Sequence, residues 1–378
     1  MKGRTIGELG DSVSRLTSAL EKELTSRGLE SPTVDDETPG SLSEIDPQAA
    51  RELIETVREL EVLVQGPRQT LGLMGLQVHD SSSLGAVVLF DIPNLVPPGG
   101  SSTYAELSAK SGLDEDRLTR ILRYAMTNFI FREGPAGHVR HTVLSAHLTQ
   151  SPSFCDFLRT IALVFNPANT CLSIALQRFP NTQSMTQTGH SVARHTEQTF
   201  YDWLDNNPDL RDSFDRGMEG ISRGGQRLQD TDLRAYPWKD LPRHSIVVDV
   251  GGSGGHFARD LAQLHPEFTI IVQDLPRVIE VALKERRGKG VTNVSYQAHS
   301  FFDEQPVRGA DVYFMRHIFH NHPDTECVAI LNALLPALKP GARVLVSEYI
   351  VPSAENVDRD LGSKAMRRVS SHSRFAGT

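Results

Sequence analysis

The stretch VVDVGGSGGHFARDL, residues 247–261, decides the fold of this chain. A β-branched run leads into a glycine-rich turn, and the turn leads directly into a helical pattern. Glycines let the backbone turn sharply and approach a ligand closely, and the N-terminus of the following helix offers free N–H donors. By itself, such a loop suits a dinucleotide, a nucleoside or only a tight turn.

The sequence around this loop alternates between strand and helix patterns. Apolar β-branched runs occupy 246–250, 269–274, 310–315 and 342–348, and helical patterns such as FARDLAQL and CVAILNALLPAL lie between them. Buried strands that alternate with helices predict a parallel α/β sheet.

The second of these strands narrows the choice of ligand. It ends in Asp274, which lies 274 − 255 = 19 residues after Gly255. A carboxylate there can accept both ribose hydroxyls of an adenosine-type ligand, and a helix cap after the strand is the less favoured alternative. The dinucleotide pattern G-x-G-x-x-G fails because position 257 is Phe. The acidic Asp249 before the turn instead fits S-adenosylmethionine, whose cationic amino group favours a nearby carboxylate.

The N-terminal part of the chain has a different, mainly helical character. Residues 1–46 hold one amphipathic segment and then a stretch rich in Ser, Pro and acidic residues, so we expect a frayed helix and a flexible linker. The pattern AARELIETVRELEVLVQ predicts a helix that ends before Gly66 and Pro67. Residues 151–240 are again mainly helical in pattern.

Residues 103–133 predict two helices, with Gly112 between them and Asp114 as the cap of the second, and a β-hairpin follows. This order is typical of a winged helix. Three arginines on the second helix (Arg117, Arg120 and Arg123) leave DNA binding open. We favour a scaffold or dimerisation module, because a DNA-binding face needs clustered positive charge.

Composition limits the function classes. The chain has 378 residues and a formal net charge of −8, which argues against nucleic acid or an anionic membrane as the main partner. Its length suits two domains, and its three cysteines offer neither a disulfide framework nor a zinc cluster. We find no apolar run long enough to span a bilayer and no signal peptide, so we expect a cytoplasmic protein.

Four ordered motifs, DVGGSGG, QDLPRVIE, MRHIFHNHPD and VLVSEYIVP, resemble those of plant- and fungal-type class I S-adenosylmethionine-dependent O-methyltransferases. The resemblance covers roughly residues 50 to 355. It implies a Rossmann-like catalytic domain at 241–378, a helical substrate-lining region at 151–240 and a winged-helix dimerisation domain at 47–150. It also implies a homodimer.

Two residues are candidates for the chemistry. His320 follows the strand at 310–315, at the edge of the sheet where α/β active sites form, and histidine is the commonest general base. Glu348 ends the next strand in order and can hold the tautomer of His320 by accepting its Nδ1 proton. The resemblance implies the same two roles.

The resemblance further implies the residues around the cofactor and the substrate. The methionine end would lie at Asp249, Gly251, Gly252 and Gly255, the ribose and adenine at Asp274 and Leu275, and the adenine ring near Ser300, Phe301 and Arg316. Ser300 stands where the family usually has Asp. Met185 and Met218 are the candidates for contact with the substrate, and no metal is implied.

The resemblance weakens at the C-terminus. Only 378 − 352 = 26 residues follow Pro352, too few for the helix and two strands that normally close this sheet, so we expect a shortened catalytic domain. The family's second catalytic carboxylate has no counterpart. We expect an enzyme that methylates a phenolic or enolic hydroxyl of an aromatic, polyketide-type molecule. The alternative is a catalytically impaired relative that acts as a regulatory or partner-binding dimer.

Overall fold

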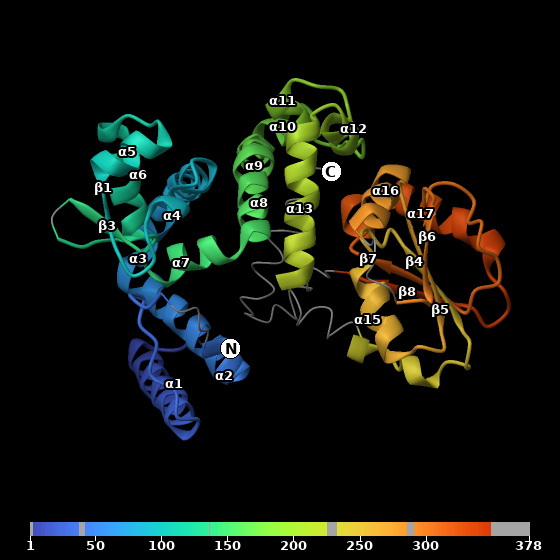
Figure 1. Ribbon diagram of the computed structural model, residues 1–378, viewed down its shortest axis with the longest axis horizontal. Helices are drawn as coiled ribbons and strands as arrows, with labels where there is room; N and C mark the ends of the chain where they lie inside the picture. Colours follow the sequence, from blue (N-terminus) through green and yellow to red (C-terminus); the bar gives the residue numbers. More distant parts are fainter. Residues whose placement is uncertain (1–2, 38–41, 136, 225–232, 286–290, 349–378) are drawn as a thin grey trace. The chain divides into compact units, whose positions relative to one another are not determined.

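The computed structural model describes residues 3–37, 42–135, 137–224, 233–285 and 291–348 (Figure 1). The described chain forms two compact units, one that ends at Val164 and one that begins at Phe165. Each unit is described separately below.

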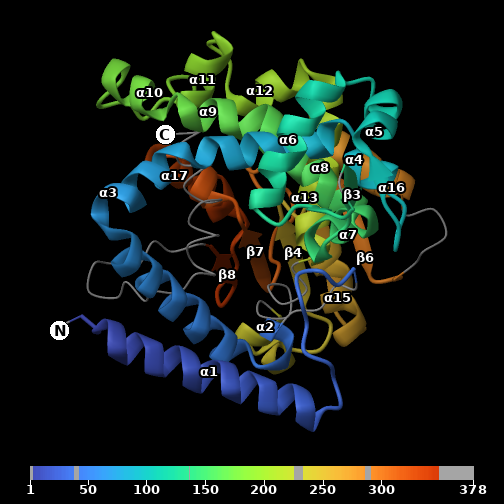
Figure 2. The same ribbon diagram turned by 90° about the vertical axis from the view of Figure 1, so that its left-hand side faces the viewer.

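The first unit begins with helices α1 (Ile6–Ser26), α2 (Leu42–Ile45) and α3 (Pro47–Leu89). A capping box at Thr5 starts α1, which buries the leucine stripe Leu9, Leu16, Leu20 and Leu24. Figure 2 shows α1 beside the first half of α3, and the ion pair Arg15–Glu52 (2.6 Å) joins the two helices. The expectation of a frayed helix is wrong, because α3 covers the leucine stripe.

Helix α3 changes direction at the predicted point. Asp46 caps its start by accepting hydrogen bonds from the N–H groups of Gln48 and Ala49. Gly66 has φ 72° and ψ 168°, so it interrupts the helical backbone, and helix resumes from Pro67 to Leu89. The predicted end before Gly66 is therefore a break within one long element.

The rest of the first unit matches the helix–turn–helix and hairpin pattern. Its elements are α4 (Ile92–Leu95), β1 (Ser102–Thr103), α5 (Tyr104–Ser111), α6 (Glu115–Thr127), β2 (Arg132–Glu133), β3 (His138–Arg140), α7 (Val143–Gln150) and α8 (Pro152–Thr160). The strands form a small antiparallel sheet in the order β1-β3-β2. Gly112 ends α5 with φ 74°, and Asp114 caps α6 as predicted.

Two of the three arginines of α6 are engaged in ion pairs. Arg120 pairs with Asp116 at 3.4 Å, and Arg123 pairs with Glu133 at 3.3 Å. These pairs reduce the positive charge that the sequence suggested for a DNA-binding face.

The second unit starts with a helical region. After the π-turn η1 (Ile161–Phe165), it contains α9 (Asn166–Thr170), α10 (Leu172–Arg178), α11 (Gly189–Arg194), α12 (Phe200–Asp205), α13 (Pro208–Gly224) and the 3-10 turn η2 (Trp238–Asp240). Phe165, Phe200 and Phe214 pack ring to ring within it, with centroids 5.7 to 6.3 Å apart.

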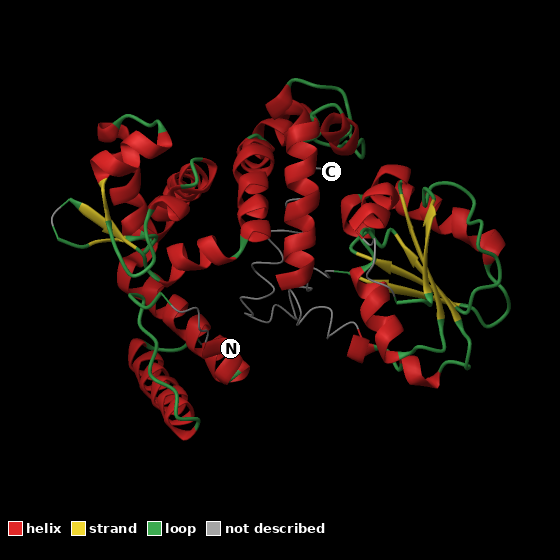
Figure 3. Cartoon of the chain, viewed as in Figure 1, coloured by secondary structure: helices red, strands yellow, loops and turns green. Residues whose placement is uncertain are grey.

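A five-stranded parallel sheet follows (Figure 3). Its elements are β4 (Ile246–Val250), α15 (His256–Leu264), β5 (Thr269–Asp274), α16 (Pro276–Glu285), β6 (Val294–Ala298), β7 (Val312–Arg316), η3 (Phe319–Asn321), α17 (Asp324–Leu334), η4 (Leu335–Ala337) and β8 (Arg343–Ser347). The strand order β6-β5-β4-β7-β8 confirms the Rossmann-like expectation. Strand β6 was not among the predicted strands.

Alternate residues of the strands build two cores. Val247 and Phe314 pack with Phe257 and Leu261 of α15 on one face. Val248, Val250, Tyr313 and Met315 pack with Ile330 and Leu334 of α17 on the other face. Because both faces are covered here, the central strands β4 and β7 are mainly apolar and buried. Asp249, Asp274 and Arg316 lie at or near the C-terminal ends of their strands.

The expected shortening of the sheet concerns the segment after Glu348, which lies outside the described residues. In the described part of the chain, no helix is long and apolar enough to cross a membrane.

Candidate active site

The glycine-rich loop joins β4 to α15 with a backbone that needs glycine. Gly251 has φ 68° and Gly255 has φ 72°, both in the left-handed region that other residues rarely adopt. The N–H of Gly252 donates to the carbonyl of Gln273 on β5 at 3.0 Å, which fixes the loop against the neighbouring strand. The loop therefore presents its backbone at the C-terminal edge of the sheet.

Asp249 lies under this loop. It is 2% exposed, and its Oδ2 accepts no hydrogen bond within the described chain. Burial raises the pKa of Asp249 to about 7, with Asp274 adding to the rise and Arg316 opposing it. A Cβ at Gly252 would lie 2.4 Å from that same oxygen, so only glycine fits there. The result is a buried carboxyl group at the base of an open backbone turn.

Asp274 ends β5 beside the same loop. Its Oδ2 accepts the N–H of Ser253 and its Oδ1 accepts the N–H of Leu275, both at 2.8 Å. Burial raises the pKa of Asp274, and these two hydrogen bonds oppose the rise. The side chain thus joins the loop to the residue that precedes α16.

Of the predicted adenine-side residues, the structure brings Phe301 to the loop. A Cβ placed on Gly251 would lie 3.8 Å from the Phe301 ring and 2.8 Å from Ile318. The Ser300 hydroxyl accepts the N–H of Phe302 at 3.3 Å, so it organises its own turn. Leu275 is exposed, and its side chain is available to a ligand.

His320 and Glu348 meet at the adjoining strand ends. His320 lies in η3 just after β7, and its Nδ1 is 2.6 Å from Oε2 of Glu348. The other carboxylate oxygen accepts the N–H groups of Ile318 and Phe319, each at 2.6 Å. Both side chains are close to nine-tenths buried. The predicted pair is therefore formed, and Glu348 is held from two sides.

The environment keeps Glu348 ionised. Burial raises its pKa, but the hydrogen bond and charge of His320 and the N–H of Phe319 outweigh burial and lower it. An anionic Glu348 accepts a hydrogen bond from the Nδ1–H of His320, so the lone pair of the neutral imidazole lies on Nε2. That tautomer suits a general base.

Arg316 and His317 end β7 beside this pair. The charge of Arg316 acts on Asp249 and lowers its pKa. His317 has φ 55°, and burial, Arg316 and His320 lower its pKa to about 4, so it is neutral at physiological pH. The backbone N–H of His317 donates to the carbonyl of Ser347 on β8 at 3.0 Å.

The predicted substrate residues lie in the helical region. Met185 is half-buried between α10 and α11, and Met218 is half-buried on α13. No described hydrogen bond or ring contact joins either one to His320. Tyr201 of α12 does reach this edge of the sheet, because its hydroxyl lies 3.5 Å from Nδ2 of Asn321.

Sequence reasoning missed three residues of this site. The Tyr296 hydroxyl of β6 donates to the carbonyl of Gly254, and it would lie only 2.6 Å from a Cβ on Gly255. The alternation in VSYQA was its only signal. Tyr201 has no motif around it, and the motif MRHIFHNHPD does not distinguish His317 from its other histidines.

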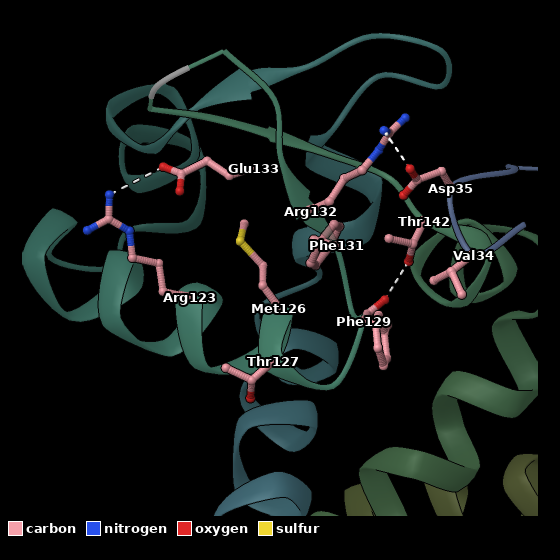
Figure 4. Close-up of a pocket in the computed structure, with 10 residues that line it drawn as sticks. All are labelled: Val34, Asp35, Arg123, Met126, Thr127, Phe129, Phe131, Arg132, Glu133 and Thr142. Atoms are coloured by element: carbon pink, nitrogen blue, oxygen red, sulfur yellow. Dashed lines mark hydrogen bonds and ion pairs between the residues drawn. The ribbon is translucent and has the colours of Figure 1, made fainter.

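A separate pocket of about 460 Å³ lies in the first unit, between α6, β2 and the segment around Val34. Figure 4 shows Met126 and Phe131 between two ion pairs, Arg123–Glu133 and Arg132–Asp35. Both guanidinium groups are already paired, so the pocket has no uncompensated charge to select a ligand.

The family model of the O-methyltransferase domain matches residues 188–368. O-methyltransferase aoiF of Aspergillus oryzae is 33% identical over 359 residues, which cover 91% of this chain and 84% of that protein. The chlorophenol O-methyltransferase of Trichoderma longibrachiatum is 33% identical over 354 residues, which cover 92% of this chain and 76% of that protein.

Solved structures show the same fold. The crystal structure of OxaC has a TM-score of 0.77 at 23% identity and covers 98% of this chain and 89% of its own. The LepI complex with SAM has a TM-score of 0.72 at 19% identity, and the match covers 98% of this chain and 90% of the LepI chain. Together with relatives above 30% identity along nearly the whole chain, these findings show that the protein belongs to the family of S-adenosylmethionine-dependent O-methyltransferases.

Proposed function

We propose that this enzyme transfers a methyl group from S-adenosylmethionine to a phenolic or enolic hydroxyl of an aromatic, polyketide-type small molecule. The observation that carries the proposal is the His320–Glu348 pair (2.6 Å) at the sheet edge that also bears the glycine-rich loop. The relative named for chlorophenol, a phenol, supports this class of acceptor.

The residues present fit the cofactor. A Cβ at Gly251 would clash with Ile318 and one at Gly252 with Asp249, so only a glycine loop can run this close over Asp249. The buried Oδ2 of Asp249 accepts no hydrogen bond within the described chain. An amino group with positive charge would satisfy that oxygen and favour its ionised form. Asp274 and Phe301 would hold the ribose and the adenine. When bound, the cofactor supplies an electrophilic methyl group on a sulfonium.

The protein supplies the base. A phenol has a pKa of about 10, so at neutral pH its proton must be removed as the oxygen attacks. In the proposed step, Nε2 of His320 accepts that proton. Glu348 then stabilises the imidazolium through its bond to Nδ1. Because the backbone N–H groups of Ile318 and Phe319 fix Glu348, the base keeps one orientation.

The test is methyl transfer from labelled S-adenosylmethionine to a panel of phenols, with benzyl alcohols as acceptors that have no acidic hydroxyl. We expect labelled ethers from the phenols only. Cofactor binding is measured separately by calorimetry. Binding without transfer to any phenol or enol would contradict the proposal and support the alternative of a regulatory dimer.

We further propose that the enzyme is a homodimer formed through the first unit. Residues 62–78 of α3 contain one charged residue, Arg68, and their apolar side chains are exposed around the helix. These are Val62, Leu63, Val64, Leu71, Leu73, Met74, Leu76 and Val78. Exposed apolar surface of this extent is typical of an interface.

The three free cysteines support the proposal that the enzyme works in the cytoplasm.

A further inference from the structure

A third side chain stands beside the catalytic pair and has no part in the proposed methyl transfer. His317, His320 and Glu348 each offer one nitrogen or oxygen atom, and these atoms lie within 4.8 Å of one another. The two imidazole rings are 5.8 Å apart between centroids. All three side chains are partly buried at the ends of β7 and β8.

Two imidazoles and one carboxylate, with one position left open, form a ligand set that proteins use for Zn²⁺. The backbone already brings the ligands together: the N–H of His317 bonds to Ser347, and the N–H of Ile318 bonds to Glu348.

We propose that His317, His320 and Glu348 bind one Zn²⁺ ion and that this ion switches off the catalytic base. Nδ1 of His320 and Oε2 of Glu348, now 2.6 Å apart, would separate to about 3.3 Å to hold a tetrahedral ion at about 2 Å from each. The other oxygen of Glu348 keeps its hydrogen bonds from Ile318 and Phe319.

The inhibition follows from the chemistry of imidazole and rests on the proposed function. In the metal-free pair, Nδ1 of His320 carries the proton and the basic lone pair of the ring lies on Nε2. When Nδ1 donates its lone pair to Zn²⁺, a neutral ring carries its proton on Nε2. Nε2 then cannot remove a proton from the acceptor. His317 therefore makes the active site sensitive to zinc without taking part in methyl transfer.

The experiment is calorimetric titration of ZnCl₂ into the full-length protein after treatment with a chelator. We compare the wild type with His317→Asn, because asparagine tolerates the left-handed φ of 55° at this position. The matched control is His322→Asn, which removes a neighbouring histidine paired with Glu326 at 2.8 Å. We expect one site in the wild type, at least about tenfold weaker binding in His317→Asn, and no change in His322→Asn.

In the activity assay, Zn²⁺ should inhibit the wild type and EDTA should restore it. The zinc concentration for half inhibition should rise at least about tenfold in His317→Asn, in parallel with its weaker binding. Absence of one-to-one binding, or equal zinc affinity in wild type and His317→Asn, would overturn the proposal. Because calorimetry needs no methyl transfer, an enzyme that binds zinc but is inactive in EDTA would count against the proposed function alone.

Discussion

The carboxyl group of Asp249 is enclosed at the end of β4, and burial raises its pKa to about 7. Above this pH the group is ionised and attracts a cationic amino group, and below it the group is neutral. We therefore expect the affinity for S-adenosylhomocysteine, which keeps the amino group, to rise about tenfold per pH unit from pH 5.5 to 7 and then level off.

Calorimetry across this pH range provides the measurement, with Asp249→Asn as the comparison. The variant should bind about as weakly at pH 8 as at pH 6, because it has no charge to gain. A wild-type affinity that stays constant between pH 5.5 and 7.5 would show that Asp249 does not face the amino group.

Two glycines of the loop, Gly252 and Gly254, provide a test variant and a matched control. A Cβ at Gly252 would meet Oδ2 of Asp249 at 2.4 Å and Val272 at 3.0 Å, whereas at Gly254 the nearest atom is the end of the His256 side chain at 3.3 Å. Gly252→Ala should weaken cofactor binding at least about tenfold through this clash, and Gly254→Ala should change it less than about threefold. Equal binding by both variants would contradict the assignment of the loop.

Much of the site was predictable at the residue scale, because strand ends in a parallel sheet converge. His320 and Glu348 follow consecutive motifs, and their pairing needs only adjacent parallel strands, which β7 and β8 provide. Tyr296 and Tyr201 were not predictable, because they reach the site through side-chain length from β6 and α12. No local sequence pattern encodes such a contact.

At the scale of elements, ion pairs of one buried and one partly exposed arginine connect α12, α13 and α16. Arg211 is 5% exposed and pairs with Asp205 at 2.8 Å and Asp215 at 3.0 Å. Arg277, which follows the Asp274 loop, pairs with Asp212 at 2.7 Å and is 40% exposed. These contacts join the helical region to the segment proposed to hold the ribose.

Replacement of Arg211 and replacement of Arg277 should lower the free energy of unfolding by different amounts. Arg211→Ala leaves the half-buried Asp215 without its main partner, so the free energy of unfolding should fall by about 2 kcal/mol. Arg277→Ala removes a solvent-screened pair and should cost less than about 1 kcal/mol. Urea denaturation measures the free energy of unfolding of both variants. Similar decreases in the two variants would show that burial of the arginine does not determine how much its ion pairs stabilise the protein.

Local sequence signals predicted where helices begin and end better than they predicted how the helices pack against one another. The cap at Asp114 and the turn at Gly112 were readable because capping is encoded within a few residues. The firm packing of α1 was not, because it depends on α3, about 20 residues further along the chain. Strand β6 was missed because its exposed positions break the apolar run that marked the other strands.

At the scale of the whole molecule, the proposed dimer depends on the apolar surface of α3. Leu71 is 67% exposed and Met74 is 58% exposed. The double variant Leu71→Glu/Met74→Glu should sediment as a monomer, because two charges would be buried in the interface. Val328→Glu, at an exposed position of α17 in the second unit, serves as the control and should remain a dimer. A monomeric wild type would contradict the proposal.

The central claim is that His320 removes the proton of the acceptor. The most direct measurement is single-turnover methyl transfer by the wild type and His320→Ala, with phenols whose pKa values range from about 10 to below 7. For weakly acidic phenols, the wild type should be faster by about 10² to 10⁴. For phenols already ionised in the buffer, this advantage should shrink to about tenfold or less. An equal advantage across the whole series, or none at all, would contradict the assignment of His320 as the base.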